Sequence, residues 1–167
     1  EKRYLTKKDN IHADVVILRH TLEHIQSPHL FLSLLSEIFP PSALIFIEVP
    51  QLDWIEENQI LFDFTYEHVN YFNKYSLSSF FSKVIDSGNL LCGQAQYLMA
   101  KFESLDLSQW ETYADLDQWQ NYEFSYYYDA FRALTSRFKK FKKIWVWGGA
   151  TKGVLFLKHL SKCDKKL

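Results

Sequence analysis

The sequence has little cysteine, and its charges almost cancel. It contains 2 cysteines among 167 residues. Cys92 and Cys163 lie far apart without a CxxC pair, so the sequence indicates neither a disulfide framework nor a zinc knuckle. Lys and Arg number 19 against 20 Asp and Glu, which gives a formal net charge of −1. That balance does not favour nucleic acid as a partner.

Long hydrophobic runs are also missing. No apolar stretch approaches the roughly 20 residues that a membrane-spanning helix needs. The chain opens with the charged residues Glu1-Lys2-Arg3 and continues with polar ones, unlike a signal peptide. We therefore expect a cytoplasmic protein that does not bind membranes. A hydrophobic content of 47% is enough for one core or parts of two.

Short apolar runs in the first third predict an α/β fold. Residues 13–18 form the kind of apolar run typical of a buried, central parallel strand. Apolar residues then recur at helical spacing from Pro28 to Ile38, with Ser27 as a candidate cap. Residues 43–49 read as a second buried strand. Together these segments predict a strand-helix-strand crossover.

The rest of the chain predicts three further parts. A helix is expected from Ser76 through Ile85, ended by Gly88, with strands at 90–92 and 97–102. One or two amphipathic helices are expected between 108 and 140, with spaced apolar residues at Trp119, Tyr122, Tyr126, Phe131, Leu134 and Phe138. A strand at 144–147 followed by a helix would open a second Rossmann-like unit. The expected domains are 1–104, 105–142 and 143–167.

Polar residues follow the first predicted strand. Ligands of open α/β sheets bind beyond the carboxyl ends of the strands, where residues 19–24 lie. Residues 20–24 also match the H-x-x-E-H pattern of inverted zinc proteases, which requires a continuous helix. A helix directly after a buried strand is not expected, and no further ligand cluster follows, so we predict no metal site. The alternative is that His20 and His24 are loop residues without a functional role.

A long loop after the second predicted strand is rich in aromatic and titratable residues. Histidine can take up and return a proton near neutral pH, and an adjacent glutamate can orient it or bind a hydroxyl. The pair Glu67-His68 is therefore suited to proton transfer. The alternative is a surface pair among core aromatics.

Glycines cluster once more near the end of the chain. Residues 147–153, Trp-Gly-Gly-Ala-Thr-Lys-Gly, resemble a phosphate-binding turn without matching the P-loop or G-x-G-x-x-G patterns. Backbone amides at Gly148 and Gly149, together with Lys152, could hold a phosphate. The glycines could equally serve only a tight strand-to-helix turn.

Residues 14–25 and 48–50 resemble the fourth and fifth strands of class I S-adenosylmethionine-dependent methyltransferases. The loop at 62–72, Ser76-Leu77 and the glycine turn at 147–153 occur in the same order in sugar C-methyltransferases. The resemblance covers about 13–160. It implies a partial Rossmann-like methyltransferase sheet, a helical connector and the start of a second Rossmann-like unit.

The resemblance also implies an activity. S-adenosylmethionine is the implied cofactor, and the implied acceptor is a small molecule such as a nucleotide-linked keto-deoxysugar. A base removes the proton beside the ketone, and the enolate carbon attacks the methyl group. The implied roles are His68 as base, Glu67 as hydroxyl-binding or orienting residue, His24 as donor to the keto oxygen, and Arg19 and His20 as neighbours of the cofactor.

Substrate contacts are implied for Thr65, Tyr66, Asn70, Gly148, Gly149 and Lys152. In the sugar enzymes a tyrosine stands where this chain has Thr65, and this departure bears on the keto-sugar substrate more than on methyl transfer. The chain also lacks the upstream glycine turn, acidic ribose ligand and four-cysteine zinc module. We therefore expect a fragment, a chain with missing segments or a degenerate remnant that binds the cofactor poorly alone.

Two other functions stay open at this stage. The first is a binding or scaffold module that keeps the methyltransferase half-fold without its chemistry. The second is a nucleotide-sugar or nicotinamide-binding protein built on the glycine turn. A zinc hydrolase is a distant third. The sequence does not indicate the oligomeric state.

Overall fold

The chain forms two compact units, which are described separately. The computed structural model describes residues 5, 6, 8, 9, 11–108, 110 and 125–163. Unit 1 comprises residues 1–54 and 68–116, and unit 2 comprises residues 55–67 and 117–167. The predicted domains at 1–104, 105–142 and 143–167 stay a prediction.

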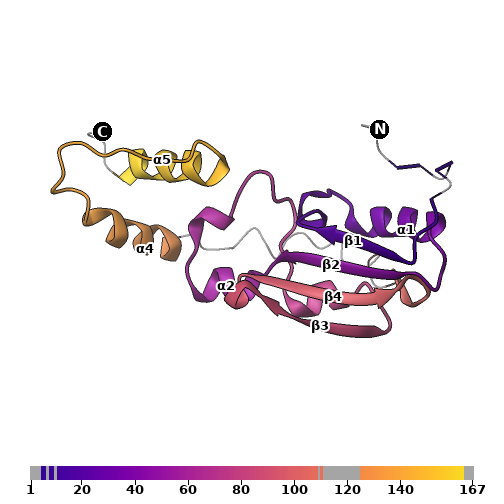
Figure 1. Ribbon diagram of the computed structural model, residues 1–167. Coiled ribbons are helices and arrows are strands. Elements are labelled where there is room, and N and C mark those ends of the chain that lie inside the picture. The colour runs from indigo at the N-terminus through magenta and orange to yellow at the C-terminus, as the bar shows by residue number, and fades with distance from the viewer. Residues whose placement is uncertain (1–4, 7, 10, 109, 111–124, 164–167) are drawn as a thin grey trace. The chain divides into compact units, whose positions relative to one another are not determined.

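Unit 1 is built on a four-stranded mixed sheet (Figure 1). The strands are β1 (Val15–Arg19), β2 (Leu44–Pro50), β3 (Val84–Leu90) and β4 (Ala95–Lys101), in the order β1-β2-β4-β3. β1 and β2 pair in parallel, whereas β4 runs antiparallel to both of its neighbours. The last of the four described strands, β4, is therefore inserted between two earlier ones. This arrangement confirms the α/β class and the partial Rossmann-like sheet.

The predicted crossover between β1 and β2 is confirmed. Helix α1 (Pro28–Ile38) starts with a proline, which lacks the backbone N–H that would have no partner in the first turn. Ser27 occupies the N-cap position, but its side chain makes no capping hydrogen bond. The helix ends before Pro40, because a proline cannot continue it.

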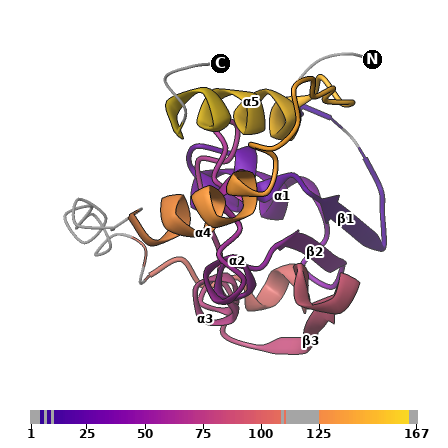
Figure 2. The ribbon, with the colours of Figure 1, turned by 90° about the vertical axis from the view of Figure 1, so that its left-hand side faces the viewer.

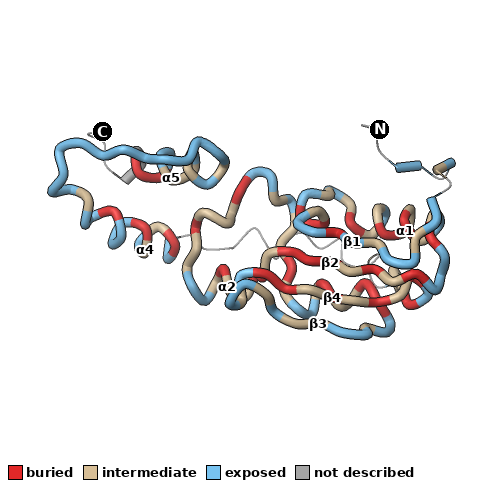
Figure 3. Tube along the Cα trace, in the orientation of Figure 1, coloured by how far each residue is buried: buried red, intermediate tan, exposed pale blue. Residues whose placement is uncertain are grey.

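The core of unit 1 lies on one face of the sheet. Ile45, Ile47 and Val49 alternate along β2 and are fully buried, because successive side chains of a strand point to opposite faces. Leu98 and Ala100 on β4 lie opposite Ile47 and Ile45, and both strands carry buried positions (Figure 3). α1 packs Leu32 and Leu35 into the same cluster, together with Leu18, Leu22, Phe39, Ala43, Phe72, Leu77, Phe80, Phe81 and Phe102.

The prediction that β1 is central is wrong for the described residues. β1 lies at the edge of the sheet, and Val15 and Ile17 on its other face are 47% and 62% exposed. An apolar run shows that a segment forms a strand. It does not show how many neighbours the strand has.

The predicted helix from Ser76 through Ile85 is also wrong. Helix α3 (Lys74–Ser78) is short and is capped by Asn73, whose side chain accepts a hydrogen bond from the Ser76 backbone N–H at 2.8 Å. The chain then enters β3, where Gly88 is a strand residue instead of a helix end. A Cβ at Gly88 would lie 2.9 Å from the Tyr97 ring, so glycine makes room for that ring.

Of the strand predicted at 90–92, only Leu90 is a strand residue, at the end of β3, and the remainder is a turn. Residues Leu91–Gly93 form a short 3₁₀ helix, and Leu91, Cys92 and Gly93 all have positive φ. Such a run reverses the chain between β3 and β4. The strand predicted at 97–102 is confirmed, shifted slightly toward the N-terminus as β4. A second 3₁₀ helix, Phe102–Ser104, follows it.

Unit 2 contains helices α4 (Ser125–Ser136) and α5 (Thr151–Cys163) and the 3₁₀ helix Leu61–Asp63 (Figure 2). Helix α2 (Leu52–Glu57) spans the boundary between the units. Phe62 packs its ring against Phe131 at 5.5 Å and Phe156 at 5.6 Å between ring centroids. Leu61, Tyr127 and Leu160 complete a buried cluster. The aromatic loop is thus anchored to both helices.

The helix expected between 108 and 140 is confirmed in part by α4, whereas its role as a connector stays a prediction. Tyr126, Phe131 and Leu134 lie on α4, whereas Trp119 and Tyr122 lie outside the described residues. The strand predicted at 144–147 is wrong, because these residues pair with no described strand and Trp145 is 94% exposed. The helix predicted after it is α5. Among the described helices, none has both the length and the apolar character to cross a membrane.

Candidate functional site

A salt bridge joins the carboxyl ends of β1 and β2. The parallel register places Arg19 beside Glu48. The Arg19 Nε donates to Glu48 Oε2 at 2.8 Å, and its Nη2 donates to Oε1 at 3.1 Å. The Glu48 side chain is 4% exposed and the Arg19 side chain 65% exposed. A buried carboxylate thus holds an arginine at the strand ends, where α/β sheets bind ligands.

This pairing perturbs both groups. The hydrogen bond from Arg19 lowers the pKa of the Glu48 carboxyl, against the opposing effect of burial. The same hydrogen bond raises the pKa of Arg19. Glu48 therefore stays ionised in the folded protein to a lower pH than an ordinary glutamate.

His20 connects this pair to the next segment. Its Nε2 lies 3.2 Å from Glu48 Oε1, and its Nδ1 lies 3.2 Å from Glu23 Oε1. The residue has φ 45°, an uncommon left-handed conformation for a side chain of this size. The turn directly after β1 thus places the imidazole between two carboxylates.

Residues 20–24 do not form the helix that the zinc-protease pattern requires. Only the 3₁₀ helix Leu22–His24 is present, and it buries Leu22 and Glu23. The Glu23 side chain is 1% exposed, its Oε1 faces His20, and its Oε2 has no hydrogen-bond partner in the described structure. A buried carboxylate oxygen of this kind is rare in folded proteins.

Three hydrogen bonds hold the 68–72 segment against this turn. The backbone N–H groups of Val69 and Asn70 donate to the Glu23 carbonyl at 2.9 and 3.1 Å. The Asn70 side-chain amide donates to the Ile25 carbonyl at 2.6 Å. Asn70, predicted to contact substrate, therefore positions the loop.

These three hydrogen bonds bring His24 and His68 together. Their ring centroids lie 4.9 Å apart at an interplanar angle of 69°. The His24 side chain is 38% exposed, its Nε2 lies 3.9 Å from Glu23 Oε1, and His68 is half-buried. Tyr71 packs its ring 6.0 Å from His68. Two residues 44 positions apart in the sequence thus form an accessible imidazole pair near the buried Glu23 carboxylate.

Unit 2 contains the other predicted site residues. Thr151 Oγ1 donates to Glu67 Oε2 at 3.0 Å, and the Lys152 ammonium forms an ion pair with Asp63. Tyr66 is 78% exposed, whereas Thr65 is buried at 8% exposure. The start of α5 is therefore fastened to the loop that carries Glu67.

The glycine turn borders a hollow of about 430 Å³ in unit 2. Gly148 has φ 114°, a conformation that favours glycine. A Cβ at Gly153 would lie 1.8 Å from the Gly148 carbonyl oxygen, so only glycine fits there. The lining residues are Trp147, Gly148, Ala150, Thr151, Lys152 and Gly153.

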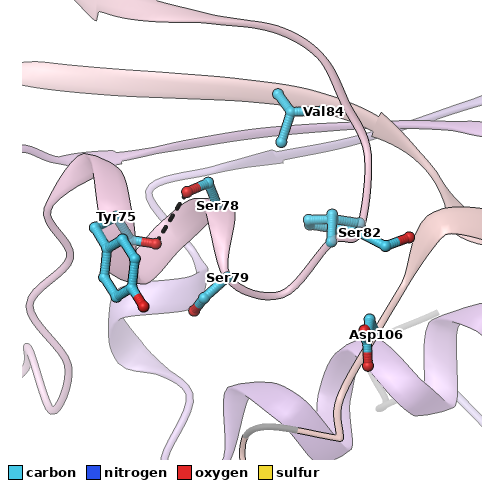
Figure 4. Close-up of a pocket in the computed structure, with 7 residues that line it drawn as sticks. Tyr75, Ser78, Ser79, Ser82, Val84 and Asp106 are labelled. Carbon is cyan, nitrogen blue, oxygen red and sulfur yellow. Dashed lines mark hydrogen bonds between the residues drawn. The ribbon is translucent and has the colours of Figure 1, made fainter.

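A separate hollow of about 290 Å³ lies in unit 1 near α3 (Figure 4). Tyr75, Ser78, Ser79, Ser82 and Asp106 are among its lining residues, and the Ser78 hydroxyl donates to the Tyr75 carbonyl at 3.0 Å. None of the predicted site residues lines it. We assign it no role.

The structure groups the predicted residues into two sets. In unit 1, Arg19, His20, His24 and His68 lie near the ends of β1 and β2. In unit 2, Glu67 contacts Thr151 and Lys152 contacts Asp63. Sequence reasoning missed Glu48 as the link between Arg19 and His20. The available signal was an acidic residue inside an otherwise apolar strand, because a buried charge needs a partner.

Comparison with known proteins gives one similarity, which covers the first part of the chain. Residues 2–84 match the family model of a methyltransferase domain. The match includes β1, α1, β2, and the turn and loop that carry His24 and His68. A search among curated proteins gives no match. Residues 2–84 are therefore similar to a methyltransferase domain.

Proposed function

We propose that the protein transfers a methyl group from S-adenosylmethionine to a carbon atom of a small keto compound, such as a nucleotide-linked keto-deoxysugar. The observation that carries this proposal is the His24–His68 pair at the carboxyl end of β1, inside the part that matches a methyltransferase domain. Carbon is a poor nucleophile until it loses a proton, so such an acceptor requires a base.

The carboxyl ends of β1 and β2 are the proposed binding site of the cofactor. Arg19 and His20 are partly exposed, and the buried Glu48 fixes both at the edge where open α/β sheets bind ligands. Bound there, S-adenosylmethionine supplies an activated methyl group. Arg19 and His20 would border it, while Glu48 keeps their side chains in place.

The imidazole pair would carry out the proton chemistry. His68 takes the proton from the carbon next to the ketone, and His24 donates a hydrogen bond to the oxygen of the resulting enolate. The enolate carbon would thereby become the nucleophile for the methyl group, and the electrons of the methyl–sulfur bond would stay on the sulfur atom. His68 keeps the proton until it passes to solvent. Tyr71, in contact with the His68 ring, would orient it.

The contacts within unit 2 support a nucleotide-linked acceptor. Glu67 would bind a sugar hydroxyl, and the Gly148-Gly149 amides with Lys152 would hold the diphosphate. Support comes from the Thr151–Glu67 hydrogen bond, which ties loop to turn, and from the hollow beside the turn. Because Lys152 is paired with Asp63, a phosphate would have to displace that carboxylate. Of the two loop hydroxyls proposed to contact the substrate, Tyr66 is accessible and Thr65 is buried.

A binding module without catalysis is the second candidate. It is favoured by the burial of Thr65, which takes the place of a tyrosine in the sugar enzymes. A binding module would keep the cofactor or acceptor contacts and would not exchange the proton next to the ketone. Proton exchange therefore separates the two functions.

The test uses a panel of nucleotide-linked keto sugars and measures two rates. The first is the exchange of deuterium from solvent into the acceptor carbon, and the second is the transfer of a labelled methyl group. We expect His68→Asn to lower both rates by about 10²- to 10⁴-fold, the usual contribution of a general base. His12→Asn changes an exposed histidine away from the pair and serves as control. Exchange and transfer that survive His68→Asn would rule out the assigned base.

A further inference from the structure

We propose that Glu23, His24 and His68 form a binding site for a divalent transition-metal ion of the zinc class. One ligand atom from each of the three side chains can be chosen so that all lie within 4.8 Å of one another. Tetrahedral zinc sites with two histidines, one glutamate and an open fourth position are a known type. The inference does not depend on the proposed methyl transfer.

The buried carboxylate is the first argument. Glu23 is 1% exposed, and its Oε2 has no hydrogen-bond partner in the described structure. A buried charged group is costly unless a countercharge and bonds to its oxygens compensate. A cation bound by the Glu23 carboxylate would supply the countercharge.

The choice of ligands is the second argument. His20 is engaged by Glu48 and Glu23, so the H-x-x-E-H pattern cannot work in its usual way. The fold instead brings in His68, which no sequence spacing indicates, through the backbone bonds from Val69 and Asn70 to the Glu23 carbonyl. Two imidazoles and one carboxylate favour zinc-like ions over magnesium or calcium, which prefer oxygen ligands.

The geometry requires only a small closure. Zinc bonds of about 2.0–2.1 Å set ligand atoms about 3.3 Å apart in a tetrahedron. His24 is 38% exposed, so its ring can rotate toward Glu23 without disturbing the core. The same exposure leaves a fourth position open to water or to an oxygen ligand.

Metal binding and the proposed proton transfer would exclude each other. The ion and the proton would compete for the imidazole lone pair of His68, and an ion on His24 would occupy the space of the enolate oxygen. We therefore expect zinc to inhibit deuterium exchange into the acceptor.

The experiment titrates Co²⁺ into the tag-free protein and follows its visible absorption, then displaces it with Zn²⁺. Cys92 and Cys163 are changed to serine in all samples, because thiolates also bind these ions. No cofactor or acceptor is present, so a negative result leaves the methyl-transfer proposal untouched. We expect one saturable site with tetrahedral cobalt bands.

Variants separate this site from surface binding. Loss of His24 or His68 to alanine is expected to weaken binding at least about tenfold, because even outer-shell changes cost 10- to 100-fold. His24→Ala removes an exposed side chain and leaves the core intact, so a folding defect cannot explain its effect. His12→Ala, also exposed, should bind normally. Absent binding, or binding that survives both ligand variants, would overturn the proposal.

Discussion

At the scale of single residues, carboxylates organise the strand ends. Glu48 holds Arg19 and His20, and Glu23 faces His20 and lies near His24. Both glutamates are almost fully buried, so their charges act in surroundings where water screens little. The site is thus a chain of alternating acidic and basic groups.

The Glu48 carboxyl should make stability depend on pH. Its pKa is lowered in the folded state, mainly by the hydrogen bond from Arg19, so its contribution is complete above the unfolded pKa of about 4.3. That contribution is lost as pH falls through the lower folded pKa. We expect Glu48→Gln to be less stable than the wild type near pH 7 and the difference to shrink below about pH 4.3.

Urea unfolding at a series of pH values measures this difference. Glu57→Gln, an exposed glutamate on α2, is the control and should show little effect. A Glu48→Gln difference that stays constant down to the acid range would mean that the pairing with Arg19 does not set the pKa.

The sequence indicated which residues belong to the candidate site better than it indicated which residues contact one another there. His24 and His68 were predicted from their positions after strand ends, and the structure brings them within ring contact. The role of Glu48 was missed because register pairs it with Arg19, and register is a property of the folded sheet. Whether the assigned chemical roles are correct stays a prediction.

At the scale of elements, the predictions succeeded where the apolar pattern is clear. β1 and β2 have nearly continuous apolar runs and α1 has helical spacing, and all three were predicted nearly to their ends. β3 was missed because Asp86, Gly88 and Asn89 are residues typical of turns, and their strand conformation comes from pairing with β4. The segment 144–147 has strand-like composition, but a strand requires a partner that no described segment supplies.

The turn into α5 gives a prediction at this scale. Gly153→Ala would drive a methyl group into the Gly148 carbonyl, because the Cβ would lie 1.8 Å from that oxygen. We expect α5 to lose about 1–3 kcal/mol of stability, the usual cost of overpacking, despite the better helix propensity of alanine. Hydrogen exchange of the α5 amides measures this loss.

Gly149→Ala is the matched control for that experiment. A Cβ there meets no atom within 4 Å, and Gly149 does not have the positive φ of Gly148. Unchanged protection is expected for this variant. Equal protection in both variants would contradict the close approach of Gly153 to the Gly148 carbonyl.

At the scale of the whole molecule, the methyltransferase match and the compact units follow different boundaries. The match ends at residue 84, at the start of β3, whereas unit 1 continues to residue 116 and includes β4. β4 follows the matched residues in the sequence and pairs with both β2 and β3, so it belongs to unit 1 although it lies outside the match. The α/β class was predictable from alternating patterns, while the inserted strand order was not.

The most direct test of the central claim is calorimetric titration of S-adenosylmethionine and S-adenosylhomocysteine. Two folded proteins are compared, the chain of 167 residues and the complete product of its gene. The account predicts that the complete product binds each ligand saturably at one site. It makes no prediction about which of the two ligands has the higher affinity. Absence of binding heat in both proteins would contradict S-adenosylmethionine-dependent methyl transfer and leave the binding module in its place.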